Sequence, residues 1–358
     1  MAKITFNNRQ SPFFDALREK IDNYFAEKKV DQTGNSKLYL KTAILAGSAV
    51  TLYVLLVFVD LPNWLALSLC GLLGVGFASI GFNIMHDGAH GSYSNNKQVN
   101  NLAAYSLNLM GGSSFMWKIK HNIIHHTFTN IEGVDDDIDV RPLLRLNDQQ
   151  PKYWFHRFQH YYAMVLYGAT YFIWVFWKDY EKYFSRRVGV TPIRKMKTTE
   201  HVGFWFSKIL YIALFLGIPA YTKGIADTLI GYSVLLFFCG LVIAVVFQLA
   251  HTVEGTHFPQ PNPDSQKIEE EWAVHQIQTT ANFATQSKIA SWFMGGLNFQ
   301  VEHHLFPRIS HIHYPELSRI VRETCKEFNL DYIEYPTVWS AIGAHLRHLK
   351  TLGKPGLA

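Results

Sequence analysis

The sequence has little cysteine and little charge. It holds three cysteines in 358 residues, and 17% of its residues are charged, against roughly 25% in an average soluble domain. The cysteines are far apart and form no CxxC or Cys/His zinc spacing, which excludes a disulfide scaffold and a zinc finger. A hydrophobic content of 48% excludes a disordered chain. Little charge together with this apolar excess predicts a membrane protein.

Four uncharged or nearly uncharged runs approach the ~20 residues that a helix needs to cross a bilayer. They cover residues 42–59, 61–85, 202–220 and 229–250. Short polar connections join the first run to the second and the third to the fourth, so the runs form two hairpins. The predicted fold class is therefore all-α and integral to the membrane, with four transmembrane helices and a helical cap on the cytoplasmic side.

Lysine and arginine lie mainly on one predicted side of the membrane. Residues 1–41 hold 8 of them, residues 86–201 hold 14 and residues 251–358 hold 9, whereas the two hairpin turns hold only Lys223. Positive residues favour the cytoplasmic side, so both termini and the central loop are predicted to be cytoplasmic, at the inner membrane if the source is bacterial. No basic stripe with interleaved aromatics suggests a nucleic-acid partner.

These boundaries divide the chain into five parts. Residues 1–41 should form a cytoplasmic amphipathic helix that starts near Ser11 and lies on the membrane surface. The remaining parts are a transmembrane hairpin at 42–85, a cytoplasmic and interfacial region at 86–201, a second hairpin at 202–250 and a cytoplasmic region at 251–358. Within the central region, residues 160–177 have equal positive charge on both sides, which predicts an interfacial helix that does not cross.

Histidine is abundant, with 17 residues, and the clustered ones fall on the predicted cytoplasmic side. Three motifs carry them: HDGAH at 86–90, HNIIHH at 121–126 and QVEHH at 300–304. His251 adds a fourth position directly after the last apolar run. Residues four apart on a helix point the same way, so the first two motifs each present a histidine pair, and His126 is turned roughly 100° from His125.

These histidines predict a dinuclear metal site. Imidazole suits zinc, copper, iron and nickel, whereas structural zinc sites commonly include cysteine. Eight clustered histidines exceed the needs of one ion and match the needs of two. A nitrogen-rich pair of irons beside the bilayer suits O₂ chemistry. The scattered histidines, His257 among them, are expected to be ordinary polar residues.

The three motifs resemble the histidine boxes of membrane-bound fatty acid desaturases, and the resemblance covers roughly residues 10–350. The sequence segments around the motifs also resemble those of this family, among them HHTFTNIEGVDDDIDV and GGLNFQVEHHLFPRISHIHYPELSRIV. The glutamine that opens the third box is typical of the front-end group, which includes Δ6- and Δ5-type and linoleoyl-CoA desaturases. By this resemblance, two irons would be held by His86, His90, His121, His125, His126, His251, His303 and His304.

The resemblance leaves some roles around the irons open. Gln300 replaces a histidine ligand of acyl-CoA desaturases; it could bind iron, hold a water or only form hydrogen bonds. Phe247 stands where those relatives have an asparagine that holds an iron-bound water. Carboxylates near the motifs are candidates to accept hydrogen bonds from the outer imidazole N–H groups. These candidates are Asp87, Asp135, Asp137, Glu254 and Glu302.

The activity implied is O₂-dependent insertion of a cis double bond into a long acyl chain, between an existing double bond and the carboxyl end. The substrate would be a fatty acyl-CoA or an acyl-lipid within membrane lipid. No catalytic residue beyond the metal ligands is expected. The sequence has no HPGG motif and little room before residue 42 for a fused cytochrome b5 domain, so a separate ferredoxin or cytochrome b5 is the expected electron donor.

Two other functions compete with this one. Another di-iron membrane oxygenase, such as a lipid hydroxylase or ketolase, would share the ligands and differ only in the fate of the substrate. A non-enzymatic haem or metal carrier would instead place histidine or acid at bilayer depth. The interiors of the four apolar runs contain neither histidine nor acid, which disfavours a carrier.

Overall fold

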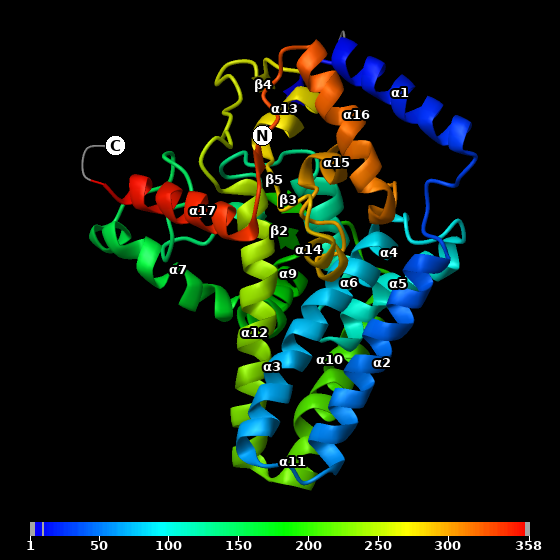
Figure 1. Ribbon diagram of the computed structural model, residues 1–358. Helices are drawn as coiled ribbons and strands as arrows, with labels where there is room; N and C mark the ends of the chain where they lie inside the picture. The colour runs from blue at the N-terminus through cyan, green and yellow to red at the C-terminus, as the bar shows by residue number, and fades with distance from the viewer. Residues whose placement is uncertain (1–3, 9–10, 355–358) are drawn as a thin grey trace. The chain divides into compact units, whose positions relative to one another are not determined.

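The computed structural model describes residues 4–8 and 11–354. It is mostly helical, and the described strands are two residues long (Figure 1). The chain divides into two compact units. Unit 1 comprises residues 1–33, 120–161 and 247–358, and unit 2 comprises residues 34–119 and 162–246.

Unit 2 contains most of the apolar helices. Its elements are α2 (Ser36–Phe58), α3 (Asn63–Ile80), η1 (Gly81–Met85), α4 (His86–His90), α5 (Lys97–Leu109), α6 (Ser114–Lys118), α8 (Thr170–Ile173), η5 (Trp174–Lys178), α9 (Asp179–Ser185), α10 (Thr198–Ile212), η6 (Ala213–Gly217) and α11 (Ile218–Lys223). Strands β2 (Arg187–Val188) and β3 (Thr191–Pro192) form an antiparallel pair. Three helices run from one unit into the other: η2 (Ile119–His125), α7 (Gln159–Gly168) and α12 (Ile225–His251).

The four predicted membrane helices are confirmed as helices long and apolar enough to cross a membrane. They span Ser36–Phe58, Asn63–His90, Thr198–Lys223 and Ile225–His251. Asn35 caps the first by accepting a hydrogen bond from the Lys37 amide. Gly224 has a φ of 89°, a left-handed value that suits glycine and makes the turn between the last two. The chain at 159–185 is also helical, and its interfacial position stays a prediction.

Unit 1 holds the shorter helices. They are α1 (Pro12–Lys28), η3 (Asp136–Ile138), η4 (Trp154–Phe158), α13 (Trp272–Thr279), α14 (Lys288–Phe293), α15 (Gln300–Leu305), η7 (His311–His313), α16 (Tyr314–Glu327) and α17 (Val338–Gly353). Parallel pairs join β1 (Thr5–Phe6) to β4 (Lys267–Ile268) and β5 (Asn282–Phe283) to β6 (Glu334–Tyr335).

The N-terminal helix differs from the expectation in what covers its apolar face. Its apolar residues Phe13, Leu17, Ile21 and Phe25 are buried in one core cluster with residues of α13, α15 and α16, and α1 lies beside α16 (Figure 1). The prediction that this face rests on the membrane was wrong. An amphipathic stripe satisfies either a bilayer or a protein core, and here the protein supplies the cover.

Two of the histidine motifs adjoin or occupy π-helical turns. Residues Gly81–Met85 form one such turn immediately before His86, and Ile119–His125 form another. In the second, the amide of His126 donates to the carbonyl of His121, five residues earlier, at 3.0 Å. A π-turn aligns residues five apart and is frequent at functional sites. His126 therefore lies over His121 instead of turning away, which corrects the α-helical expectation.

Candidate metal centre

Unit 1 brings together six of the eight predicted ligands. Three of them form a buried triangle: His125 comes from η2, His251 from the end of α12 and His304 from α15. One ring nitrogen from each of the three lies within 4.8 Å of the others. The spacing and burial of this set are those of side chains that could hold one metal ion.

The other three histidines of unit 1 lie beside this triangle. The rings of His126 and His303 are 4.5 Å apart, and those of His121 and His126 are 4.7 Å apart. The two Nε2 atoms of His121 and His126 are separated by 3.2 Å. His126 also stacks on His304 at 4.4 Å, so the two groups of three adjoin. Two adjoining groups of imidazoles suit a pair of ions better than one.

Four of the six histidines of unit 1 are held from outside through their Nδ1 atoms. His125 Nδ1 lies 2.9 Å from Asp135 Oδ2, and His303 Nδ1 lies 3.1 Å from the Tyr314 hydroxyl. The Nδ1 atoms of His251 and His304 contact the Thr279 carbonyl at 3.3 Å and Gln276 Oε1 at 2.8 Å. A metal-bound histidine typically donates its second N–H to such an acceptor, which fixes the ring and leaves Nε2 for the metal.

The opposite ring nitrogens supply the test of fit for a metal. Within the described parts of the chain, Nε2 of His125 and Nε2 of His251 are buried and meet no hydrogen-bond partner. A buried polar nitrogen without a partner is costly, and a metal ion would remove that cost. Buried imidazoles in this number fit iron, as they fit zinc, copper and nickel.

Charged side chains next to the triangle control protonation. Asp137 accepts from Lys120 at 2.5 Å, and its Oδ2 lies 3.8 Å from Nδ1 of both His121 and His125. Burial lowers the pKa of His121 to about 4, so this ring is neutral, as a ligand must be. Burial opposes the charge on His125, but the carboxylates of Asp135 and Asp137 raise its pKa.

The remaining two predicted ligands lie in unit 2. His86 and His90 occupy the end of the long helix Asn63–His90, and their rings are 4.7 Å apart. Trp117 packs against both, at 5.6 Å from His86 and 6.0 Å from His90. Asp87 is buried beside them, close enough to Lys41 for an electrostatic interaction.

Gln300 and the two glutamates have different surroundings. Gln300 is buried on α15, and its Oε1 has no hydrogen-bond partner within the described residues. Glu302 accepts from Asn282 at 2.7 Å and from the Tyr332 hydroxyl at 2.8 Å; burial raises its pKa to about 7. Glu254 accepts from Arg347 at 2.9 Å at the surface. Neither glutamate contacts a predicted ligand through the bonds found in the described chain.

Phe247 packs directly on the triangle. Its ring lies 4.7 Å from that of His251, one turn later on α12, and 5.2 Å from that of His125. An aromatic ring offers no donor or acceptor to a water. Phe247 therefore makes this wall of the site apolar.

Four supporting residues were not foreseen from the sequence. Gln276 and Thr129 contact His304 Nδ1, at 2.8 and 3.3 Å, and Tyr314 contacts His303. The Asn130 side chain donates to the His251 carbonyl at 2.8 Å, and the backbone N–H of Asn130 donates to Asp135 at 3.0 Å. No periodicity marks these residues. Tyr314 lies in the segment that follows the third motif, but a tyrosine there carries no metal signal.

Comparison with known proteins agrees with this site. A family model described as "Fatty acid desaturase" matches residues 62–336. The chain is 36% identical to the sn-1 linoleoyl-lipid 6-desaturase of Synechocystis sp. (strain ATCC 27184 / PCC 6803 / Kazusa), over 98% of both chains. It is 36% identical to the protein of the same name from Arthrospira platensis, over 98% of this chain and 95% of that one.

A more distant relative is the acyl-lipid (8-3)-desaturase of Physcomitrium patens, 35% identical over 95% of this chain and 72% of that protein. The family match spans the first and third histidine motifs and everything between them. The chain therefore belongs to the fatty acid desaturase family, and the protein is a fatty acyl desaturase.

Proposed function

We propose that this desaturase acts on a lipid-linked acyl chain, with linoleoyl as the substrate, and inserts a cis double bond on the carboxyl side of the existing ones. Two relatives that match nearly the whole chain are named sn-1 linoleoyl-lipid 6-desaturases. The glutamine that opens the third box, Gln300, supports the front-end position. The observation that carries the proposal is the match to these two relatives over nearly the whole chain. The buried triangle of His125, His251 and His304, with each Nδ1 held from outside, supports the metal-dependent chemistry.

The proposed ligands of two irons are the eight predicted histidines. The six in unit 1 are supported by their ring separations, and four of them, His125, His251, His303 and His304, also by acceptors at Nδ1. His86 and His90 are included because they form the first histidine motif and their ring centroids lie 4.7 Å apart. Gln300 is proposed as an additional oxygen donor, to a metal or to a bound water, because its buried Oε1 has no other partner in the described chain.

Bound iron would provide the chemistry that removes hydrogen from unactivated methylene groups, with O₂ as the oxidant. The reaction consumes one O₂, two electrons and two protons, removes two hydrogens from adjacent carbons and releases two waters. The chain's own residues orient the imidazoles and exclude solvent. Asp135 holds the N–H of His125, and the Phe247 ring covers His125 and His251.

The proposed active site and both termini face the cytoplasm, where a separate electron donor of the ferredoxin or cytochrome b5 class supplies the electrons. Lysine and arginine placement supports this sidedness, since the turns at 60–64 and 221–228 together contain one such residue. The central and C-terminal segments that carry the second and third boxes contain most of the others.

Product analysis tests the substrate and the position. The protein is expressed in a host without polyunsaturated fatty acids, which is fed linoleate or oleate, and each lipid class is analysed by mass spectrometry. We expect linoleate to gain a double bond at carbon 6 within glycerolipids. A product confined to acyl-CoA would overturn the lipid-linked substrate. A hydroxylated product would overturn desaturation as the outcome of the chemistry.

Metal analysis tests the centre separately. Protein purified without oxygen should contain about two irons per chain, because six clustered histidines already exceed the needs of one ion. One iron per chain after full loading, or zinc alone in an active sample, would contradict the di-iron proposal.

A further inference from the structure

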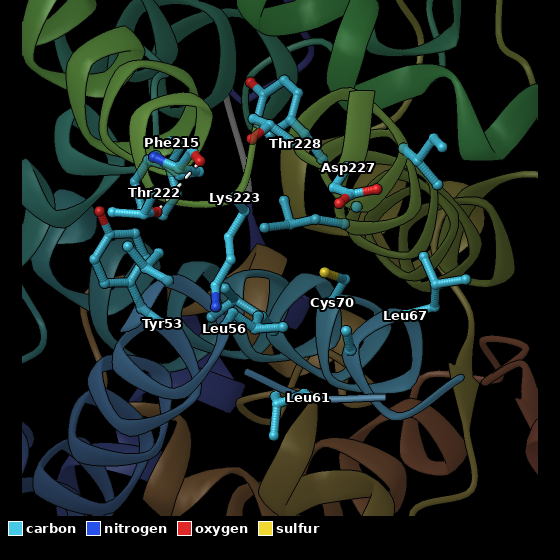
Figure 2. A pocket seen from close by; sticks show the side chains of 18 of the residues that line it. Tyr53, Leu56, Leu61, Leu67, Cys70, Phe215, Thr222, Lys223, Asp227 and Thr228 are labelled. Carbon is cyan, nitrogen blue, oxygen red and sulfur yellow. Dashed lines mark hydrogen bonds between the residues drawn. The ribbon is translucent and has the colours of Figure 1, made fainter. Parts of the chain in front are cut away.

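A cavity of about 440 Å³ lies within unit 2 at the turn end of the two hairpins (Figure 2). We name it the turn-end cavity; Leu56, Leu73 and Leu235 line its apolar part, and Asp60, Lys223 and Asp227 line its polar part. Figure 2 shows the Lys223 side chain extending between Tyr53 and Cys70. Cavities of this size are typical of small-ligand sites.

The turn-end cavity is far from the predicted metal ligands of the same unit. Cys70 and His86 belong to one continuous helix, Asn63–His90. Sixteen residues separate them, which corresponds to about 24 Å along a helix at 1.5 Å per residue. The cavity is therefore not part of the site at His86 and His90.

The interior of the cavity presents mainly hydrocarbon because three hydroxyl groups of its wall are bonded to the protein. The Tyr53 hydroxyl donates to the Leu214 carbonyl at 2.7 Å, and the Tyr232 hydroxyl donates to the Tyr211 hydroxyl at 2.7 Å. The Thr228 hydroxyl donates to the Gly224 carbonyl at 2.8 Å. An acyl chain can fill such a space without leaving buried polar groups unpaired.

The polar end carries one ammonium group that can change partners. Lys223 Nζ lies 2.6 Å from Asp60 Oδ1 and 2.9 Å from the Val59 carbonyl. The Lys223 side chain is 24% exposed, whereas that of Asp60 is fully exposed. An ion pair with an exposed carboxylate is weak, so a ligand anion can replace Asp60 and leave that carboxylate hydrated.

We propose that the turn-end cavity binds a single-chain amphiphile with an anionic headgroup. The hydrocarbon chain lies among the leucines and the headgroup pairs with Lys223. A free fatty acid and a lysophosphatidic acid share this chemistry. The bound amphiphile joins the two hairpins where Lys223 meets Asp60 and Tyr53 meets Leu214, and so stabilises the bundle. The proposal is independent of the lipid that the enzyme desaturates.

Cys70 provides a direct probe because it lines the cavity and is only partly buried, whereas Cys239 and Cys325 are buried. The full-length protein in phosphatidylcholine nanodiscs is treated with N-ethylmaleimide, and alkylation of Cys70 is followed by mass spectrometry. We expect palmitate or lysophosphatidic acid to slow alkylation about tenfold, with hexadecanol less effective. Protection by only one anion identifies the headgroup class. Protection by neither overturns the proposal.

Lys223→Gln tests the headgroup contact without altering the apolar part. Half-protection of Cys70 by palmitate should require about tenfold more ligand in Lys223→Gln, because a charge-assisted contact is lost. The value for hexadecanol should not change. An unchanged palmitate requirement would overturn the assignment of the headgroup to Lys223.

Gly231→Leu tests the chain site, because a Cβ there would lie 3.0 Å from Cys70 Sγ and the side chain would occupy the cavity. Gly47→Leu is the matched control, since a Cβ at Gly47 meets nothing within 4 Å. Palmitate should raise the melting temperature of the wild type and of Gly47→Leu but not of Gly231→Leu. An equal rise in all three would place the amphiphile elsewhere. If Gly231→Leu does not fold, Lys223→Gln still decides the proposal.

Discussion

At the residue scale, the site depends on which nitrogen of each imidazole is held by the protein. Acceptors on the outer side are of four kinds: a carboxylate at His125, a backbone carbonyl at His251, a phenol at His303 and an amide oxygen at His304. All four contacts use Nδ1, so each of these rings presents the same nitrogen to the protein although the rings come from three helices. For these four histidines this arrangement favours Nε2 as the metal-binding atom.

Asp135 is the only carboxylate among these four acceptors. Asp135→Asn should lower iron affinity about 10- to 100-fold, because the amide no longer offers a charged acceptor to His125. Iron retained during dialysis against a graded chelator measures the effect without using activity. Glu254→Gln is the matched control, since Glu254 pairs with Arg347 at the surface. Equal iron loss in the two variants would contradict a special role for Asp135.

His251 is the ligand that lies outside the three motifs. His251→Ala should abolish desaturation and lower iron content while membrane insertion remains near normal, because the triangle with His125 and His304 loses one corner. Iron per chain and product yield are measured in the same membranes. His257→Ala should be much milder, since the interactions found for His257 in the described chain use its backbone. Full iron and normal product in His251→Ala would show that the motifs alone hold the metals.

At the element scale, hydropathy predicted the helices well because spanning length and composition suffice to define an apolar helix. The last two predicted runs lie within helices, and the first two do so except for Val59, Leu61 and Pro62 at the turn between them. At the other ends the helices extend beyond the runs by a few residues. Composition could not reveal the π-turn that places His126 over His121, because that register depends on one additional backbone residue. Nor could it reveal Gln276, which reaches His304 from 28 positions away.

The burial of α1 shows a second limit of sequence patterns. An apolar stripe on a helix predicts that the stripe is covered, but it does not identify the cover. Leu17 is fully buried against the core of unit 1, whereas the neighbouring Arg18 is exposed. The residues of α13 and α16 that cover the stripe lie more than 240 positions away in the sequence, so the pattern within α1 could not identify them.

Substitution within α1 can measure this packing. Leu17→Ala should destabilise unit 1 by about 2–5 kcal/mol, because it leaves a cavity in a closed core. Thermal unfolding in nanodiscs, compared with Arg18→Ala, measures the difference. A melting temperature of Leu17→Ala equal to that of Arg18→Ala would mean that the stripe is covered by lipid after all.

At the scale of the whole molecule, function requires that ligands far apart in sequence reach one side of the membrane. His86 and His90 lie at the end of the second apolar helix, and His251 ends the fourth. Two hairpins whose turns lie on one side bring both of these ends to the other side. The lysine and arginine counts predict that this other side is the cytoplasmic one, and that prediction makes no use of the histidines.

Cysteine labelling tests this arrangement directly. Asp264 is exposed in the segment after His251, and Tyr221, at the second hairpin turn, is 92% exposed. With the expected four crossings, Asp264→Cys should react with a membrane-impermeant maleimide only in inverted vesicles, and Tyr221→Cys only in intact cells or right-side-out vesicles. Peptide mass spectrometry separates each introduced thiol from Cys70, Cys239 and Cys325. If Asp264→Cys reacted from outside, the helical segment at 159–185 would have to cross the membrane. His251 and the third box would then lie on the side opposite His86 and His90, and the eight histidines could not share one centre.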